Sequence, residues 1–424
     1  MKRVVITGIG AVTPLGNHVE STWNGLTKGL SGIRGVSKFD PSGLVSRIGG
    51  ELRNFNPEEY LSKKDVLRLD PFVHYAAAAA MMAVEDGGLI RKHSAVSGPQ
   101  SETEKPFRTE IMHSAGVIIG SSRGGISSME KALDRHLTQG KPFSAYLMSS
   151  STINMAASYI SMRLGIQGPA LGISTACASG TNAIGEAFRM IRSGEIDVAL
   201  AGGAEAPVCR LAVGGYGASG ALSRRNEEPE KASRPFDRGR DGFVIAEGAG
   251  VLVLEELEHA LQRGADIYCE LAGYGTSSDA FHQTKPSSDG EAFALRKALN
   301  DAVVLPEEVD YINAHATSTP IGDLIEAEAI RKVFAERTAE IHVSSCKSML
   351  GHMLGAAGAL EAAITALTIH RGVITPGINL ENPDPGCGLN YVTSAFEKDV
   401  GTALSNSFGF GGVNAVLVLK RFND

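Results

Sequence analysis

The strongest constraint on this chain is that its second half repeats the pattern of its first. A glycine loop, a Val-Leu-Val-Leu strand and charged residues follow one another at 241–257, "DGFVIAEGAGVLVLEEL", and again at 406–422, "NSFGFGGVNAVLVLKRF". Self-similarity at this separation indicates one structural unit used twice. We therefore expect two halves of similar structure, 1–262 and 263–424, that pack against each other.

Two further pairs of segments support the duplication. Residues 174–191 and 344–367 both have a polar start followed by a helix-like run rich in Ala and Gly. The strand-like segments 3–10, "RVVITGIG", and 267–275, "IYCELAGYG", then correspond to the first strands of the two halves. Each half is expected to open on a core strand.

The order of apolar runs predicts an α/β fold. Within each half, strand-like segments alternate with helix-like ones, a pattern typical of buried, mostly parallel strands covered by helices. With 50 Gly and a single Trp, the interior must be built from small aliphatic side chains at close spacing. Helices with so much Ala and Gly can be enclosed on every side, so we expect α-β-α-β-α layers with 174–191 and 344–367 in the middle.

Charge and cysteine usage exclude several functional classes. A net charge of -7 gives no reason to expect nucleic acid as a partner. No apolar run reaches the roughly 18 residues of a membrane span, and glycines and a proline interrupt the apolar start. The five cysteines are odd in number and form no CxxC pair, which argues against a disulfide framework or a zinc site and predicts a cytoplasmic protein: Cys177, Cys209, Cys269, Cys346 and Cys387.

Cys177 differs from the other four cysteines in its setting. A lone cysteine is more often a small buried hydrophobe than a nucleophile. Cys177, however, stands in "STACASG" at the predicted start of a central helix, where free N–H groups and the helix dipole can lower a thiol pKa toward neutrality. Its small neighbours leave room for a substrate. The sequence thus predicts a nucleophile.

Two histidines are expected beside it. His315, in "NAHATSTP", follows a strand-like run, and His352, in "KSMLGHMLGAAG", precedes the central helix of the second half. His352 therefore lies close to the pseudo-symmetric counterpart of Cys177, and the starts of two paired central helices must be neighbours. The remaining histidines of this half are interpreted as structural: His282, His342 and His370.

These motifs, in this order, resemble those of a known family. "RVVITGIGAVTPLG", "STACASG", "SRPFDRGRDGFVIAEGAG", "NAHATSTP", "KSMLGHMLGAAGALEA" and "NSFGFGG" span essentially the whole chain. The chain is similar to the elongating β-ketoacyl-acyl carrier protein synthases, type II condensing enzymes of the thiolase superfamily. The resemblance implies the thiolase-like five-layer fold and decarboxylative condensation of malonyl-acyl carrier protein with an enzyme-bound acyl thioester in fatty-acid elongation.

The resemblance also implies roles for individual residues. Cys177 would take the acyl chain, with the N–H groups of Cys177 and Phe410 as oxyanion hole. His315 and His352 would donate to the thioester oxygen during decarboxylation, so that no metal or cofactor is needed. Lys347 and Glu361 match a family ion pair beside the site, for which a purely structural role is equally expected. Thr317 and Thr319 match hydroxyls that bind the pantetheine arm. Phe410 matches a gate, and Met129 matches a residue of the acyl pocket.

The expected partners are the acyl and malonyl carrier proteins and a second copy of the chain. By resemblance, Tyr146, Leu147 and Met148 reach the acyl pocket across a homodimer interface. Carrier proteins are acidic, so local basic residues are candidates for docking, although such runs are by default solvated faces: Lys63, Lys64, Arg68, Arg224 and Arg225.

Departures from the family pattern keep one alternative open. The segment 144–158 lacks the rigid aromatic and proline run typical of fatty-acid enzymes, and 91–110 is an additional polar stretch, interpreted as an exposed loop. A ketosynthase of a type II polyketide or aryl-polyene pathway, forming a heterodimer with a chain-length subunit in the polyketide case, has the same motifs. A thiolase is disfavoured because "FGFGGV" contains no second cysteine, and a chain-initiating synthase would carry Asn in place of one histidine.

Overall fold

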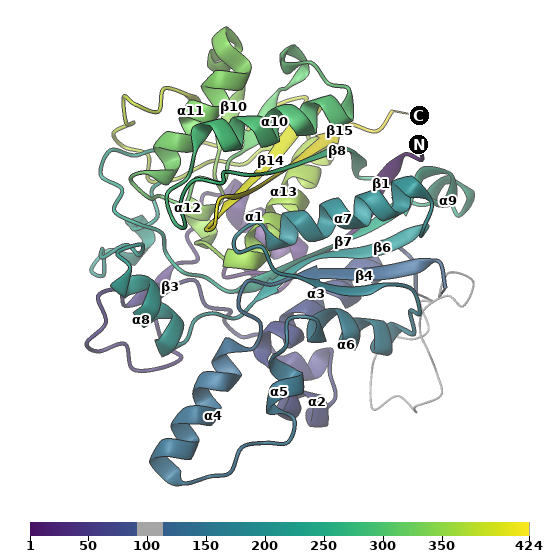
Figure 1. Cartoon of the computed structure of the whole chain (residues 1–424). Coiled ribbons are helices and arrows are strands. Elements are labelled where there is room, and N and C mark those ends of the chain that lie inside the picture. The colour runs from purple at the N-terminus through teal and green to yellow at the C-terminus, as the bar shows by residue number, and fades with distance from the viewer. Residues whose placement is uncertain (91–112, 424) are drawn as a thin grey trace.

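The computed structural model describes residues 1–90 and 113–423, and the predicted loop at 91–110 lies outside them. Helices cover both faces of a large sheet, and the two termini lie near each other (Figure 1). The strands are β1 (Val4–Val12), β2 (Arg34–Gly35), β3 (Ile48–Gly49), β4 (Ala115–Gly120), β5 (Ala170–Ile173), β6 (Val198–Glu205), β7 (Gly248–Glu256), β8 (Cys269–Ser278), β9 (Tyr311–Asn313), β10 (His342–Ser344), β11 (Val373–Ile374), β12 (Asn390–Tyr391), β13 (Phe396–Glu397), β14 (Thr402–Gly409) and β15 (Val413–Lys420).

The helices lie between and around these strands. They are α1 (Val19–Thr27), α2 (Lys63–Arg68), α3 (Pro71–Asp86), α4 (Ile126–Gln139), α5 (Leu147–Ser151), α6 (Met155–Leu164), α7 (Ser179–Ser193), α8 (Arg210–Ala218), α9 (Leu257–Gln262), α10 (Ser288–Ala302), α11 (Gly322–Phe334), α12 (Lys347–Leu350) and α13 (Ala357–Arg371). No helix in the described ranges has the length and apolar character needed to cross a bilayer.

The strand order confirms the duplication. The first half has the order β1-β7-β6-β4-β5, and the second has β8-β15-β14-β9-β10, with β12 added at the edge. Each half therefore arranges its strands in the same sequence of first, fifth, fourth, second and third. The first strands, β1 and β8, pair with each other antiparallel through Val4–Ile6, which joins the two halves into one continuous sheet.

The five layers follow from which helices contact which strands. Helix α3 packs on β1, β6 and β7, and α10 packs on β8 and β15, so these two are outer helices. Between the two halves of the sheet, α7 contacts β4 and β6 on one side and β8 and β15 on the other. Its counterpart α13 contacts β6 and β7 as well as β14 and β15. The predicted α-β-α-β-α fold with these two helices in the middle is confirmed.

The expectation of mostly parallel strands was wrong for the strands next to the joint. The pairs β1–β7, β6–β7, β8–β15 and β14–β15 are antiparallel, while β4–β5, β4–β6, β9–β10 and β9–β14 are parallel. Apart from the edge strand β5, whose residues are exposed or half-buried, these strands are mostly buried, so antiparallel strands here are as continuously apolar as parallel ones. Strand direction therefore left no trace in the hydrophobic pattern.

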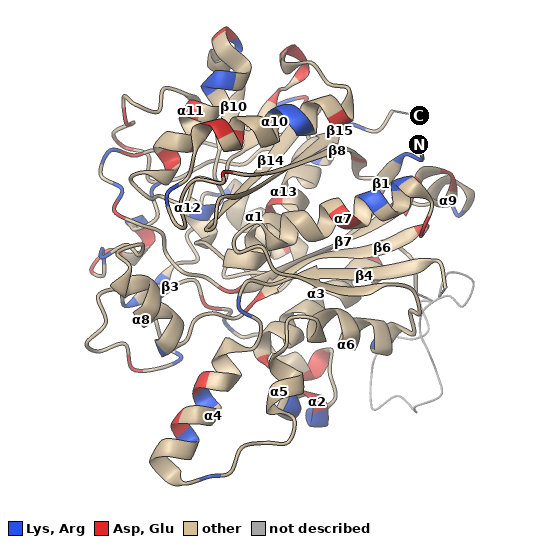
Figure 2. Cartoon of the chain, in the orientation of Figure 1, with Lys and Arg blue, Asp and Glu red and all other residues tan. Residues whose placement is uncertain are grey.

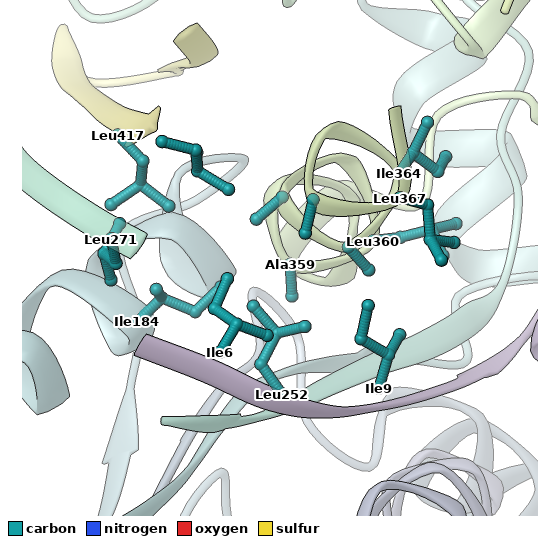
Figure 3. Packing of buried hydrophobic residues seen from close by; sticks show 14 of the residues in the cluster. Ile6, Ile9, Ile184, Leu252, Leu271, Ala359, Leu360, Ile364, Leu367 and Leu417 are labelled. Carbon is teal, nitrogen blue, oxygen red and sulfur yellow. The ribbon is translucent and has the colours of Figure 1, made fainter. Parts of the chain in front are cut away.

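The central helices approach closely because small residues lie at their crossing. A side-chain carbon added at Gly180 of α7 would lie 2.9 Å from the backbone N of Ala359 in α13, and one at Gly358 would lie 1.9 Å from Oγ1 of Thr181. Leu360, Ile364 and Leu367 of α13 belong to the same buried cluster as the strand residues Ile6, Ile9 and Leu252 (Figure 3). The whole of α13 up to Ile369 is buried, which explains its Ala-rich sequence.

Charged side chains gather on the outer helices, and the strands between them carry few (Figure 2). Helix α4 shows both signs along its length and projects from the body of the molecule together with α5 (Figures 1 and 2). Three of its apolar side chains are nevertheless exposed: Met129, Leu133 and Leu137.

Candidate active site

Cys177 lies in the turn between β5 and α7, two residues before the first residue of the helix. Ala176 has a left-handed φ of 50°, a conformation that costs a non-glycine residue energy and needs support from its surroundings. Ser179 gives that support, since its hydroxyl donates to Ala176 O over 2.6 Å and accepts from Thr175 N over 2.9 Å. The turn holds Cys177 at the head of the central helix.

Both predicted histidines lie beside this thiol. Nε2 of His352 is 3.1 Å from Sγ of Cys177. The ring of His315 meets that of His352 edge to face, with centroids 5.4 Å apart. Symmetry brings the group together, because the turn before α7 in one half and the segment before α13 in the other lie side by side.

The two imidazoles are held neutral. Burial lowers the pKa of His315 and of His352 well below the ordinary value, and the positive charge of Lys347 lowers both further. Nδ1 of each ring has no hydrogen-bond partner among the described residues. A neutral imidazole carries one donor and one acceptor nitrogen, so each ring can give or take a proton.

Lys347 and Glu361 form a buried ion pair beside the histidines. Both side chains are almost completely shielded from solvent. Burial raises the pKa of Glu361, and the adjacent ammonium of Lys347 opposes that rise. The geometry of the pair is thus as predicted, with the lysine close enough to act on both imidazoles.

The expected lowering of the Cys177 pKa was wrong. Burial raises the pKa of this thiol to about 11, against the opposing effects of the Phe410 backbone N–H and the Lys347 charge. Helix α7 begins only at Ser179, so Cys177 lies outside its first turn, whereas the dipole acts within that turn. The resting group is therefore a thiol next to a neutral imidazole.

The glycine loop between β14 and β15 brings Phe410 to Cys177. A side-chain carbon at Gly409 would lie 3.2 Å from the backbone N of Cys177 and 3.1 Å from Thr175 O. A side chain here would make tight contacts, so the glycine favours this approach, which sets the amides of Cys177 and Phe410 near each other. The Phe410 ring is 40% exposed and lines the cavity described next.

A cavity of about 480 Å³ opens onto Cys177. His315, His352, Phe410, Thr317 and Thr319 line it together with Cys177. The hydroxyls of the two threonines are 3.2 Å apart. The thiol, the two imidazoles and the predicted gate and pantetheine residues thus line one cavity, whereas Lys347 and Glu361 lie outside its lining.

Four predicted acyl-pocket residues lie elsewhere in the single chain. Met129 on α4 is 40% exposed, and none of Met129, Tyr146, Leu147 and Met148 lines the cavity. Helices α4 and α5, which carry Met129 and the last two, project away from the body (Figure 1). Their place in an acyl pocket stays a prediction that depends on a second subunit.

The sequence did not indicate which residues orient His315. Glu326 of α11 accepts from the backbone N–H of His315 over 2.8 Å and of Ala316 over 2.7 Å, while Asn406 donates to it over 3.0 Å. The Phe408 ring lies against His315, with centroids 6.0 Å apart. Only "NSFGFGG" among the quoted motifs contains any of these residues, and spacing alone gives no signal for Glu326.

One group of side chains among the described residues could hold a metal ion. The ligand atoms of Cys177, His315 and His352 all lie within 4.8 Å of one another, and thiolate with imidazole is a ligand set that Zn²⁺ accepts.

Comparison with known proteins decides the family. Residues 1–260 match the model "Beta-ketoacyl synthase, N-terminal domain", and residues 268–381 match "Beta-ketoacyl synthase, C-terminal domain". The chain belongs to the β-ketoacyl synthase family. The family predicted from the motifs is therefore confirmed.

Individual β-ketoacyl synthases are similar over their full length. The chain is 47% identical to 3-oxoacyl-[acyl-carrier-protein] synthase 2 of Coxiella burnetii over 100% of this chain and 99% of that protein. Among solved structures it resembles the ishigamide ketosynthase/chain length factor, with a TM-score of 0.89 and 37% identity, covering 100% of both chains. It also resembles AntDE:AntF, described as a type II polyketide acyl-carrier protein in complex with its ketosynthase, with a TM-score of 0.86 and 35% identity over 100% of both chains.

Proposed function

We propose that this β-ketoacyl synthase elongates fatty acyl chains by decarboxylative condensation, with Cys177 as nucleophile and His315 and His352 as the catalytic imidazoles. The observation that carries the proposal is the 3.1 Å approach of His352 Nε2 to Cys177 Sγ, with a second neutral imidazole in edge-to-face contact. A thiol, a proton acceptor and a further donor in one cavity are the groups that acyl transfer followed by carbanion formation requires.

In the first half-reaction the acyl group moves from acyl carrier protein to Cys177. As the sulfur attacks the thioester carbonyl, His352 takes the thiol proton and then gives it to the departing pantetheine thiolate. Negative charge on the carbonyl oxygen is stabilised by the N–H groups of Cys177 and Phe410. The neutral state of His352 supports this role, because only a neutral ring can accept the proton.

In the second half-reaction malonyl-acyl carrier protein loses carbon dioxide. The electron pair of the broken carbon–carbon bond moves toward the thioester oxygen, where His315 and His352 donate hydrogen bonds. The resulting carbanion attacks the acyl group on Cys177, and the Cys177 thiolate leaves and recovers a proton. Thr317 and Thr319 would hold the pantetheine arm, and Phe410 would move aside when the acyl chain enters.

The proposed partners are the acyl and malonyl carrier proteins and a second copy of the chain. Arg224 and Arg225 come three and four residues after the last of the cavity-lining residues 219–221, which supports docking of an acidic carrier near this part of the cavity. The exposed apolar residues of α4 support a homodimer through that arm. The cytoplasmic location remains the prediction from cysteine usage.

The polyketide or aryl-polyene alternative is the weaker proposal. The ishigamide and AntDE:AntF structures are 37% and 35% identical to this chain, below the 47% of the Coxiella burnetii enzyme. The test is competition between saturated and polyene acyl carrier proteins of equal length, with malonyl carrier protein as extender. Preference for the saturated chain supports fatty-acid elongation, and preference for the polyene contradicts it.

A further inference from the structure

Arg123 and Tyr216 form a polar pair beside the cavity, with no part in the chemistry described above. Arg123 lies in the turn between β4 and α4, and Tyr216 lies on α8. Nε and Nη2 of Arg123 donate to the phenol oxygen of Tyr216 over 3.0 and 2.9 Å. Since Tyr216 lines the cavity together with Cys177, the pair connects a guanidinium to the cavity wall.

Ring contacts link this pair to the nucleophile. Tyr216 meets Phe243 edge to face with centroids 5.6 Å apart, and Phe243 meets His352 in the same way at 5.2 Å. His352 in turn contacts Cys177. The charge of Arg123 is also the weakest of the effects on the pKa of the Cys177 thiol, which it lowers slightly against the larger rise from burial.

An apolar cluster lies against Tyr216. Tyr216 packs on a cluster that includes Leu222, Phe243 and Leu354, with Ile126 of α4 packed against it. Such a surface suits the hydrocarbon part of an acyl chain. The phenol of Tyr216 and the guanidinium of Arg123 lie side by side next to this cluster.

Both groups of the pair have hydrogen-bond donors to spare. Tyr216 accepts both bonds from Arg123, and its own O–H has no acceptor among the described residues. The guanidinium of Arg123 has no carboxylate oxygen within 4.0 Å in the described ranges, although the backbone N–H of Arg123 donates to Glu205 over 2.9 Å, and a guanidinium carries five N–H groups. A site with unfilled donors and an unpaired positive charge favours a ligand that brings acceptor oxygens, and an anion most of all.

We propose that Arg123 and Tyr216 form a specificity subsite that selects acyl chains carrying an acceptor oxygen on their distal part, with a carboxylate bound most strongly. The inference rests on the proposed function, because it takes the chain to be delivered to Cys177. The apolar wall holds the methylene groups, and the pair binds the oxygenated end. A plain saturated chain brings no acceptor oxygen to the pair, whose donors are open to water because Arg123 is exposed and Tyr216 half-buried.

The test compares two acyl groups of equal length on the same carrier protein, octanoyl and the ω-carboxyacyl suberyl group. The readout is kcat/KM for acylation of Cys177, with the acylated enzyme detected by intact mass. The suberyl-to-octanoyl ratio of kcat/KM should be about 10- to 100-fold higher in wild type than in Arg123→Met. That factor corresponds to one charge-assisted hydrogen bond. Tyr216→Phe should also lower the preference for the suberyl group, and Arg123→Lys should keep part of that preference.

Arg135→Met is the matched control, because Arg135 lies on α4 with the same charge and does not line the cavity, and it should leave the preference unchanged. Equal ratios of the two substrates in wild type and Arg123→Met overturn the subsite. If wild type acylates with neither group, the proposed function fails instead. Binding of the octanoyl and suberyl carrier proteins to Cys177→Ala then tests the subsite independently of the chemistry. A suberyl preference that depends on Arg123 supports the subsite, and its absence overturns it.

Discussion

Sγ of Cys177 and Nε2 of His352 lie 3.1 Å apart, although the residues are separated by almost half the chain. The duplicated topology creates this contact, because each residue precedes the central helix of its own half and the two helices pack together. The pair is a neutral thiol against a neutral imidazole, since burial raises the pKa of Cys177 to about 11 and lowers that of His352.

Cys177 should be the single site of acylation. The other four cysteines are buried, whereas Cys177 opens onto the cavity. Incubation with acyl-acyl carrier protein should add one acyl mass to wild type and none to Cys177→Ala, as measured by intact mass. An acyl adduct on the alanine variant would refute the assignment.

The reactivity of Cys177 toward iodoacetamide should keep rising with pH. With the thiol pKa at about 11, the thiolate fraction grows about tenfold for each pH unit above neutrality, and the alkylation rate should follow it. Alkylation is measured by mass spectrometry from neutral pH upward, with Cys177→Ala correcting for the other cysteines. A plateau near neutral pH would instead indicate the lowered pKa that the helix-dipole argument predicted.

The fold and the site could be predicted from the sequence to different depths. The repeat of 241–257 at 406–422 indicated the duplication, because both copies contain the glycine loop and the strand after it. Cys177, His315 and His352 could be named because each lies in a distinctive motif beside a predicted helix or strand. Strand direction could not be predicted, since strands covered on both faces are apolar throughout.

The electrostatic state of the site also lay beyond the sequence. The pKa of Cys177 depends on how many atoms shield it from water, and that is set by Gly409 and its neighbours from the far end of the chain. Glu326 positions His315 through the backbone, a contact for which no side-chain pattern exists. The pair of Arg123 and Tyr216 joins segments that only the folded chain brings together.

Replacing His315 by alanine should slow decarboxylation far more than acyl loading of Cys177, whereas replacing His352, which also takes the thiol proton in the proposed mechanism, should slow both steps. His315 and His352 both donate to the developing thioester enolate in the proposed mechanism, and loss of one such donor typically costs about 10²- to 10³-fold in rate. Release of carbon dioxide from malonyl-acyl carrier protein is the measurement, with Cys177 acylation by intact mass as the internal comparison. A variant that condenses at the wild-type rate would return that histidine to a structural role.

Charge reversal at Arg225 should weaken docking of the carrier protein. Arg225 donates to Gly239 O and lies 3.9 Å from Asp241, so it is anchored next to the cavity mouth. Arg225→Glu should raise the KM for carrier-bound substrate and leave that for a short pantetheine thioester unchanged, because only the carrier is acidic. Charge reversal at Arg135, on α4, serves as control. Equal effects of Arg225→Glu on both substrates would place its role inside the cavity.

Variants of the Lys347–Glu361 ion pair should distinguish its effect on stability from its effect on catalysis. Glu361→Gln leaves a buried ammonium without its counter-charge and should lower the free energy of unfolding by about 3–5 kcal/mol, measured by denaturant titration. The double variant Lys347→Met, Glu361→Leu removes both charges and should recover most of that stability.

Because Lys347 lowers the pKa of both histidines, its loss should also let them take up protons at higher pH. The acid limb of the decarboxylation rate should therefore move to higher pH. A stable double variant with the wild-type pH profile would make the pair purely structural, whereas a stable variant with a shifted acid limb would show that Lys347 keeps the imidazoles neutral for catalysis.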